Sequence, residues 1–455
     1  MSLLEVNPTR WSSPATFVMA AAAAVIGLGN VWRLPFLAGE YGGGAFLLVY
    51  GLALGAMALP LLVGELMLGR GARTDLVGMI GRWAQTSGLS RRWGIIGYLA
   101  LLGAVMVLSY YSVIAGWSMA YFLRSAAGLL EGLDRSGVRA GFVELASDPE
   151  KGLGWHTIFM VAATACVAQG LRRGIESTAR WMLVGAVLAL LALLAVAAGD
   201  GFTAAVQYLF RPDFAALGWR GTIDAFHQAF FSLSLGVGVM LAYGAYLPEG
   251  SSLVRVSLAV MLLDTAFALL AGLAIISLVL GAGMAPESGL PLVFELLPAA
   301  GAGGWTVTLF FFMLMLVTLT SAVGLLEPLV VWLMARLQVS RVVAACSAGA
   351  LIWFIGLGTL LSFNVLADVR LLDRTLFDWL SMLSSRFLLP AFGLLLCVFI
   401  GRFLPLAALR DAWADKPWFG LWHWLLRYPT RIGLIVVLLH SLGVFEFLER
   451  LWGTG

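Results

Sequence analysis

The sequence predicts an all-α polytopic membrane protein with eleven transmembrane helices, of which the first and the sixth are broken at mid-span. Hydrophobic residues make up 61% of the chain and charged residues only 12%. The mean hydropathy of +0.95 is far above the value typical of soluble proteins. Two apolar segments of spanning length are interrupted by glycine-rich backbone, at residues 24–30 and 232–238.

The expected spans follow one another along residues 1–455 as a single domain. They cover residues 15–37, 44–68, 94–123, 155–171, 175–198, 223–247, 254–282, 304–335, 341–361, 375–401 and 429–449. Arginine is concentrated in the loops that follow the second, fourth, eighth and tenth spans, which by the positive-inside bias predicts a cytoplasmic N-terminus and a C-terminus outside. We therefore expect a multi-pass protein of the cell's inner (plasma) membrane, with the lipid bilayer and no nucleic acid as a partner.

The two interrupted spans lie five spans apart, and this odd offset means that they enter the membrane from opposite sides. We expect an inverted repeat, with five spans in residues 10–200, five in 220–401, and the eleventh span with the C-terminus in 402–455. Unwound backbone survives at bilayer depth only where it lines a cavity, so the interruptions indicate a binding site near the membrane centre. The alternative is that their glycines only allow close helix packing.

The motifs around these interruptions resemble those of the neurotransmitter:sodium symporter family. They are residues 27–35 with 42–46 behind them, residues 228–236 in the sixth span, and residues 319–321 in the eighth. The resemblance runs from Arg10 to the tenth span and is to the shorter, eleven-span bacterial members. It implies the LeuT-type 5+5 inverted repeat and sodium-driven uptake of an amino acid or a related amine.

Asp264 lies inside the seventh span, where an ionisable group is costly and by default indicates function. Its carboxylate suits a sodium ion or a proton, and the alternative is a structural hydrogen bond. The resemblance implies a first sodium site with four protein ligands and the substrate's own carboxylate, which couples ion to substrate. The four are Val25 through its carbonyl, Asn30, Ser232 and Asp264.

A second sodium site is also implied by the resemblance. Its ligands would be the carbonyls of Ala23, Ile26 and Val317 and the hydroxyls of Thr320 and Ser321. Hydroxyls in a helix often bond back to a carbonyl of the preceding turn instead, which is the alternative for these two side chains.

Chloride dependence is not expected. Asp264 supplies a fixed negative charge where chloride-dependent members have Asn, and an unpaired cation in a low-dielectric centre is costly. Glu65 is a second candidate for charge compensation; alternatively, it holds a neighbouring broken helix through backbone amides.

The substrate is expected to carry a carboxylate, because Gly27 leaves room beside exposed amides and no acid stands there to meet a carboxylate-free amine. The resemblance implies that the Tyr111 hydroxyl reaches this carboxylate and that Tyr111 closes over it against Phe231; an interfacial tyrosine pair is the alternative. The predicted substrate-binding residues are Ala24, Val25, Gly27, Leu28, Gly29, Val107, Tyr111, Phe231, Ser232, Ser234, Val237, Ser321 and Leu325. The lining of the side-chain subsite is largely apolar, which favours a neutral aliphatic or aromatic substrate.

Two pairs of residues resemble gates. Arg33 and Asp378 resemble the outer ion pair, above the Tyr111 and Phe231 lid. Arg10 and Trp11 resemble the inner latch, but Ala335 stands where the acid that answers Arg10 is usual. Either another acid or the packing of Trp11 alone would then hold this latch.

The sequence thus predicts chloride-independent, sodium-coupled symport of a neutral, hydrophobic L-amino acid into the cell by alternating access. A proton-coupled carrier is an alternative, as is a channel or a transport-inactive sensor on the same scaffold. Enzymatic chemistry is not expected, because the four histidines lie far apart and no nucleophile–base spacing or metal cluster is present.

Overall fold

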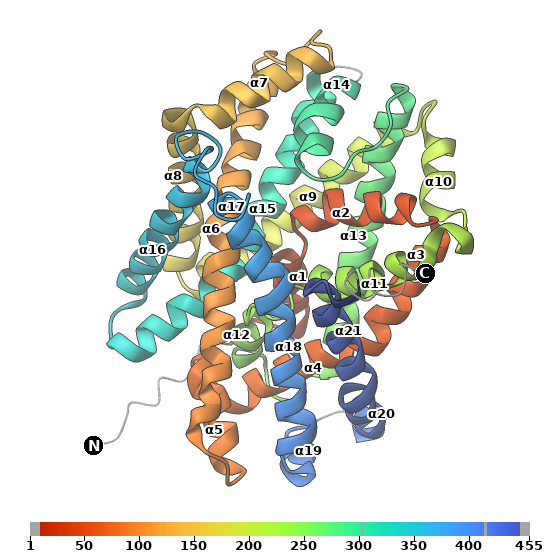
Figure 1. Ribbon diagram of the computed structural model, residues 1–455. Coiled ribbons are helices and arrows are strands. Elements are labelled where there is room, and N and C mark those ends of the chain that lie inside the picture. The colour runs from red at the N-terminus through yellow and green to blue at the C-terminus, as the bar shows by residue number, and fades with distance from the viewer. Residues whose placement is uncertain (1–9, 302–303, 414–415, 446–455) are drawn as a thin grey trace.

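The computed structural model describes residues 10–301, 304–413 and 416–445, and this part of the chain is a bundle of helices (Figure 1). Within it, seven helices are long and apolar enough to cross a membrane, and a bent helix pair adds an eighth. The predicted class of polytopic helical membrane protein is therefore confirmed. The count of eleven spans stays a prediction, and the last of them, 429–449, lies partly outside the described residues.

The first part of the chain supplies the helices of the first predicted repeat. They are α1 (Pro14–Val25), α2 (Leu28–Glu40), α3 (Gly44–Ala53), η1 (Leu54–Ala58), α4 (Leu59–Ala72), α5 (Leu76–Thr86), η2 (Arg91–Gly94), α6 (Ile95–Ala126), α7 (Arg135–Ser147), α8 (Pro149–Ala168), η3 (Leu171–Glu176), α9 (Ser177–Ala197) and α10 (Phe202–Phe210). The short α5 and α7, together with α10, lie in predicted loops between spans.

The second part repeats this pattern of long and broken helices. Its elements are α11 (Phe214–Ser232), α12 (Val239–Ala245), α13 (Leu253–Gly281), η4 (Leu292–Leu296), α14 (Leu297–Ala300), α15 (Gly304–Leu337), α16 (Arg341–Leu361), α17 (Leu376–Met382), η5 (Leu383–Leu388), α18 (Leu389–Val398), η6 (Phe399–Phe403), α19 (Leu406–Asp411), η7 (Lys416–Trp418), α20 (Phe419–Leu425), η8 (Leu426–Thr430) and α21 (Arg431–Ser441).

The first interruption separates α1 from α2, whose axes are bent by 66°. Ser13 caps the start of α1 and exchanges hydrogen bonds with Thr16, which satisfies amides that the first turn leaves free. At the break, Ile26 and Gly27 are both in extended conformations. The new helix therefore starts in the middle of the predicted first span, and the first turn of α2 leaves backbone amides free just after Gly27, as the sequence predicts.

The second interruption separates α11 from α12 over residues 233–238. Gly236 and Gly238 have φ angles of +89° and +74°, which favour glycine, and the non-glycine Ser234 has a φ of +47°. A Cβ on Gly236 would lie 2.8 Å from the Leu389 carbonyl oxygen. This break is thus fixed by conformation and by close packing against α18.

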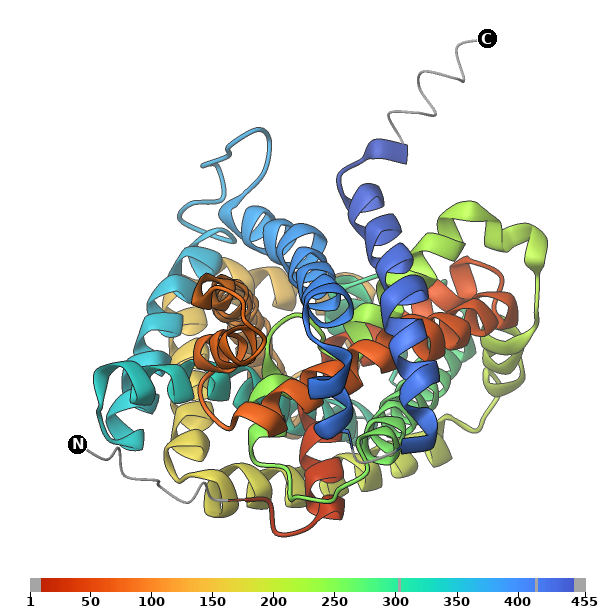
Figure 2. The ribbon, with the colours of Figure 1, turned by 90° about the horizontal axis from the view of Figure 1, so that it is seen from below.

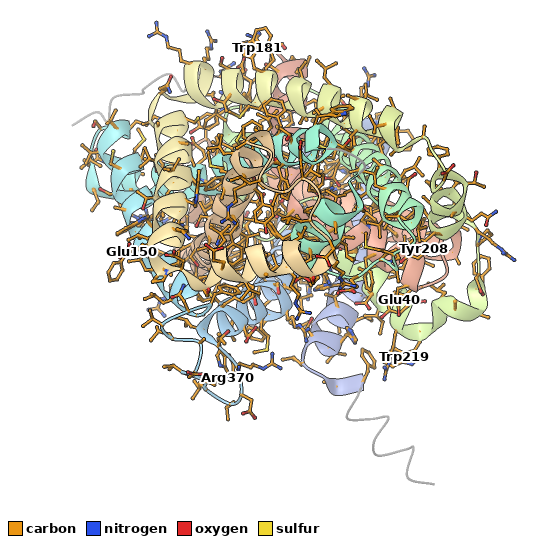
Figure 3. All side chains as sticks on the ribbon, turned by 90° about the horizontal axis from the view of Figure 1, so that it is seen from above. Glu40, Glu150, Trp181, Tyr208, Trp219 and Arg370 are labelled. Atoms are coloured by element: carbon orange, nitrogen blue, oxygen red, sulfur yellow. The ribbon has the colours of Figure 1, made fainter. Side chains whose placement is uncertain are left out.

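Close packing holds the broken helices against two long ones. A Cβ on Gly272 of α13 would lie 2.6 Å from the Pro35 ring, and one on Gly324 of α15 would lie 2.7 Å from the Ala24 Cβ. In addition, α18 and α21 lie side by side at the edge of the bundle (Figures 1 and 2). Large apolar side chains such as Trp181 on α9 point away from the bundle, as expected of a surface that faces lipid (Figure 3).

Candidate functional site

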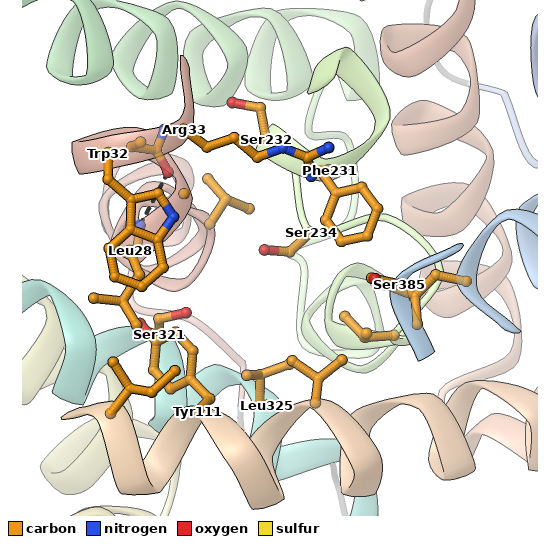
Figure 4. Close-up of a pocket in the computed structure, with 18 of the residues that line it drawn as sticks. Leu28, Trp32, Arg33, Tyr111, Phe231, Ser232, Ser234, Ser321, Leu325 and Ser385 are labelled. Atoms are coloured by element: carbon orange, nitrogen blue, oxygen red, sulfur yellow. Dashed lines mark hydrogen bonds between the residues drawn. The ribbon is translucent and has the colours of Figure 1, made fainter. Parts of the chain in front are cut away.

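A cavity of about 260 Å³ lies between the two interruptions (Figure 4). Its walls come from both broken helices, from α6 and α15, and from the junction of η5 with α18. The lining residues are Val25, Gly27, Leu28, Gly29, Asn30, Trp32, Arg33, Val107, Tyr110, Tyr111, Ile114, Gln228, Phe231, Ser232, Ser234, Val237, Ser321, Leu325, Ser385 and Leu389.

The structure brings together all the predicted substrate-binding residues except Ala24. Ala24 is buried where α1 packs on Gly324, and it does not line this cavity. Other lining residues, among them Gln228, Ser385 and Leu389, were not predicted, because nothing in their spacing marks them out. Tyr110 is the exception, since it adjoins the predicted Tyr111.

Asn30, Ser232 and Asp264 meet beside the first interruption. The Asn30 side-chain amide donates to Asp264 Oδ1 over 2.8 Å, and its own oxygen accepts from the Gly27 amide over 3.1 Å. The Ser232 hydroxyl donates to the other Asp264 oxygen. Three oxygen-bearing side chains therefore converge here, and Val25, the last residue of α1, lines the adjoining cavity. Oxygen donors of this kind are those that a hard cation prefers.

Tyr50 of α3 extends this polar cluster. Its hydroxyl donates to the Ser232 oxygen over 3.0 Å, and both side chains are buried. Sequence reasoning missed Tyr50, because a single tyrosine in an apolar span gives no signal of its partner 182 positions away.

The residues of the second predicted sodium site come from α1, from Ile26 at the break that follows it, and from α15, which packs beside α1. Ala23, Ile26 and Val317 are buried there. The Thr320 hydroxyl donates to the carbonyls of Leu316 and Val317, which is the back-bonding that the sequence left as the alternative for this residue. Its oxygen keeps lone pairs with which to accept or to coordinate.

Gly27 and the Tyr111 hydroxyl lie next to each other in the wall of the cavity. A Cβ on Gly27 would lie 3.1 Å from the Tyr111 hydroxyl oxygen and 3.4 Å from the Ser321 hydroxyl oxygen. The Tyr111 hydroxyl has Ser321 and the Leu28 amide nearby but makes no well-aligned hydrogen bond with a described residue. Phe231 faces the cavity from the opposite side (Figure 4). A buried hydroxyl with spare donor capacity thus points at the helix break.

Glu65 is fully buried in α4, and its Oε1 accepts from the Gly236 amide over 3.2 Å. Gly236 lies in the second interruption, so Glu65 satisfies one of the amides that the break leaves free. This contact agrees with the alternative that Glu65 holds a neighbouring broken helix through a backbone amide. Its other carboxyl oxygen has no partner among the described residues.

At the outer gate the structure differs from the expected ion pair. Arg33 donates to His227 Nδ1 over 2.6 Å and lies 5.4 Å from the centre of the Phe231 ring. Asp378 instead caps α17, where its carboxylate accepts from the amide and the hydroxyl of Thr375. The Arg33–Asp378 pair is therefore not formed in this conformation, because each residue has a closer local partner. The pattern T-x-x-D at the start of a helix signals such a cap, but His227 gave no signal.

Trp11, the aromatic member of the expected inner latch, is only 2% exposed. Its indole donates to the Tyr243 carbonyl over 3.1 Å, and its ring packs edge-on to Tyr243 and Tyr246. Arg10 pairs with Glu249, which answers the question left by Ala335, yet the Glu249 side chain is 71% exposed. Exposed pairs of this kind stabilise by about 0–1 kcal/mol, whereas burial of a large aromatic contributes about 3–5 kcal/mol. Of the two residues, Trp11 therefore contributes more to holding the N-terminal segment against Tyr243 and Tyr246.

Known proteins resemble this chain in sequence and in fold. The model of the "Sodium:neurotransmitter symporter family" matches residues 9–131 and 151–404. An uncharacterised sodium-dependent transporter of Bacillus subtilis, YhdH, is 34% identical over 455 residues, which are 97% of this chain and 100% of that protein. The sodium-dependent neutral amino acid transporter B(0)AT2 of Bos taurus is 29% identical over 53% of this chain and 37% of that protein. The crystal structure of MhsT in complex with L-phenylalanine superposes with a TM-score of 0.86 at 33% identity, over 95% of this chain and 100% of that one.

Proposed function

The chain belongs to the sodium:neurotransmitter symporter family, and on that premise we propose that it carries a neutral, hydrophobic L-amino acid into the cell together with sodium. Membership confirms the predicted LeuT-type fold, and it makes the chain a sodium-dependent membrane transporter rather than an enzyme. The substrate, the ion sites and the indifference to chloride are the proposal.

The observation that carries the proposal is the uneven lining of the central cavity. One end holds the free amides of the α2 start, the Tyr111 hydroxyl and the polar cluster around Asp264. The rest is lined by apolar side chains such as Val107, Val237 and Leu325. A carboxylate fits the first end, because helix N-termini and spare hydroxyls attract anions.

The apolar end favours a hydrophobic side chain. No acid is among the described residues that line the cavity, so a cationic side chain would lose hydration without gaining a partner. Arg33 is the charged lining residue, and it is engaged by His227 at the outer end. The phenylalanine held by MhsT and the neutral substrates named for B(0)AT2 support the same class of substrate.

Sodium is proposed at both predicted sites. In the first, the carbonyl of Val25 and the side chains of Asn30, Ser232 and Asp264 would hold the ion beside the substrate carboxylate, so that each ligand improves the site of the other. The Asp264 carboxylate balances the charge of this ion, which is why we propose that chloride is not required. The second ion would lie between α1 and α15, against Thr320 and Ser321.

Alternating access requires the two sides to open in turn. In this structure Trp11 is buried and the Arg33–Asp378 pair is not formed. We propose that the inner side is closed by Trp11 and that the cavity is reached from the outside in this state. By the arginine distribution, the N-terminus is cytoplasmic and the C-terminus outside.

Uptake into proteoliposomes tests the proposal. The purified protein is expected to accumulate L-phenylalanine or L-leucine under a sodium gradient and not under a proton gradient alone. A thermal-shift screen of the twenty amino acids with and without sodium then identifies the substrate, because at equal concentration the ligand with the lowest Kd stabilises the folded state most. Uptake driven equally by a proton gradient, or stabilisation by amino acids that ignores sodium, would contradict the proposal. A conductance without accumulation would indicate the channel alternative.

A further inference from the structure

A second cavity, of about 500 Å³, lies where α5, η2 and the start of α6 meet the end of α15. It shares no residue with the central cavity. Arg91, Arg92 and Arg336 line it, and all three are exposed. No acid is among its lining residues, and none of these arginines forms an ion pair with a described residue. The cavity is therefore a strongly positive site with no internal counter-charge.

The wall that carries two of these arginines is rigid. A Cβ on Gly94 would lie 3.0 Å from the Val77 carbonyl oxygen, and one on Gly97 would lie 2.7 Å from the Val77 Cα. The glycines thus let η2 and α6 pack backbone to backbone on α5. The Ser90 hydroxyl accepts from the Arg92 amide and fixes the start of η2. Because this backbone is already held in place, only the side chains of the two arginines have to be ordered when a ligand binds.

An exposed apolar stripe leads away from the arginines along α6. Ile95, Tyr98 and Leu102 are 61%, 41% and 49% exposed, and their spacing of three and four residues places them on one helix face. Ile95 and Tyr98 also line the cavity. The Tyr98 ring packs edge-on to Trp332 of α15 at 6.1 Å, an aromatic pair of the kind found at membrane–water interfaces.

We propose that this cavity binds an anionic phospholipid, with the phosphate against Arg91, Arg92 and Arg336 and an acyl chain along Ile95, Tyr98 and Leu102. Arginine matches phosphate with paired donors, and basic pockets between membrane helices bind anionic headgroups. The positive cavity complements the anionic headgroup of a phospholipid, and the apolar helix face beside it complements the acyl chain. A soluble phosphate compound would use the arginines and leave the apolar stripe without a partner.

Lipid titration of the purified full-length protein tests the proposal. Dioleoyl-phosphatidylglycerol is added in nonionic detergent, binding is followed by the thermal unfolding midpoint and by native mass spectrometry, and phosphatidylcholine is the reference lipid. Replacement of one arginine by glutamine is expected to weaken binding about five-fold, and R91Q/R92Q/R336Q about a hundred-fold. R402Q is the matched control, because Arg402 is also an exposed arginine but does not line the cavity. It belongs to η6, which lies next to η2, as the 4.7 Å between the Phe403 and Trp93 rings shows.

Two further measurements make the outcome decisive. L102Q is expected to weaken phosphatidylglycerol binding while leaving the effect of glycerol phosphate unchanged. R336Q alone serves if the triple variant does not fold, as judged by its sodium-dependent thermal shift. Phosphatidylglycerol binding by R336Q or the triple variant within about two-fold of the unmodified protein overturns the proposal, since charge pairing is its basis. Equal stabilisation by glycerol phosphate and by the lipid overturns it in favour of a soluble phosphate ligand.

Discussion

Replacement of Gly27 by alanine tests whether the first interruption is the substrate site. The new methyl would lie 3.1 Å from the Tyr111 hydroxyl oxygen and 3.4 Å from the Ser321 hydroxyl oxygen. Gly27 has a φ of −154°, an extended conformation that alanine also adopts, so backbone strain does not contribute. The effect of the substitution is therefore steric and is confined to the cavity wall.

The magnitude follows from the space available. Tyr111 is buried, so its hydroxyl has to move by a few tenths of an ångström toward the cavity, where the substrate carboxylate is proposed to bind. A mismatch of one methyl group in a binding pocket costs about 1–3 kcal/mol, or roughly 10–200-fold in discrimination. We expect Gly27→Ala to raise the Kd for L-phenylalanine at least about ten-fold. The unliganded protein should change little in stability, because the methyl enters the rim of a cavity.

Isothermal titration calorimetry in saturating sodium measures this change. Gly51→Ala is the matched control, because a Cβ on Gly51 of α3 meets no atom within 4 Å. A double-mutant cycle with Tyr111→Phe isolates the contact, since removal of the hydroxyl also removes the closest neighbour of the new methyl. Gly27→Ala should cost less in the Tyr111→Phe background. An unchanged Kd in Gly27→Ala, or strict additivity in the cycle, would refute the reasoning.

Three further outcomes follow from the same structure. Asp264→Ala is expected to lose the sodium-dependent thermal shift, because it removes the acceptor of both Asn30 and Ser232; a sodium response equal to that of the unmodified protein would exclude Asp264 from the ion site. Uptake should be unchanged when gluconate replaces chloride, and loss of uptake would show that Asp264 does not balance the ion charge. Glu65→Ala should lower the free energy of unfolding by about 1–3 kcal/mol, because it leaves the Gly236 amide without an acceptor, while Glu65→Gln should retain more of it; equal denaturation midpoints would contradict this role.

The broken helices could be predicted from the sequence because their causes are local. Glycine-rich, unwound backbone inside an apolar span has amide and carbonyl groups that lipid cannot satisfy. The residue types at 24–30 and 232–238 are therefore enough to indicate a cavity. Gly27 is needed for space beside Tyr111, and Gly236 and Gly238 for positive φ as well. In each case the residue type itself carries the structural reason.

The side-chain partners that could not be predicted from the sequence are residues far apart along the chain, which only the folded structure brings together. Tyr50 reaches Ser232 from 182 positions away, and Arg33 reaches His227 from 194 positions away. A tyrosine or a histidine in an apolar span does not reveal a partner so far along the chain, and these pairs form through the packing of α3 and α2 on α11. The same holds for Glu249, which meets Arg10 only because the chain after α12 returns to the N-terminal segment.

Competing contacts at the outer gate explain how substrate binding could control its closure. To pair with Asp378, Arg33 has to leave His227, a charged hydrogen bond of about 1.5–3 kcal/mol, and Asp378 has to give up a helix cap of about 1 kcal/mol. Desolvation of the new ion pair adds to this cost. The new Arg33–Asp378 pair would return part of this free energy, and we predict that differential binding of substrate to the closed state supplies the rest. We therefore expect the Arg33–Asp378 gate to stay open until the cavity below it is filled.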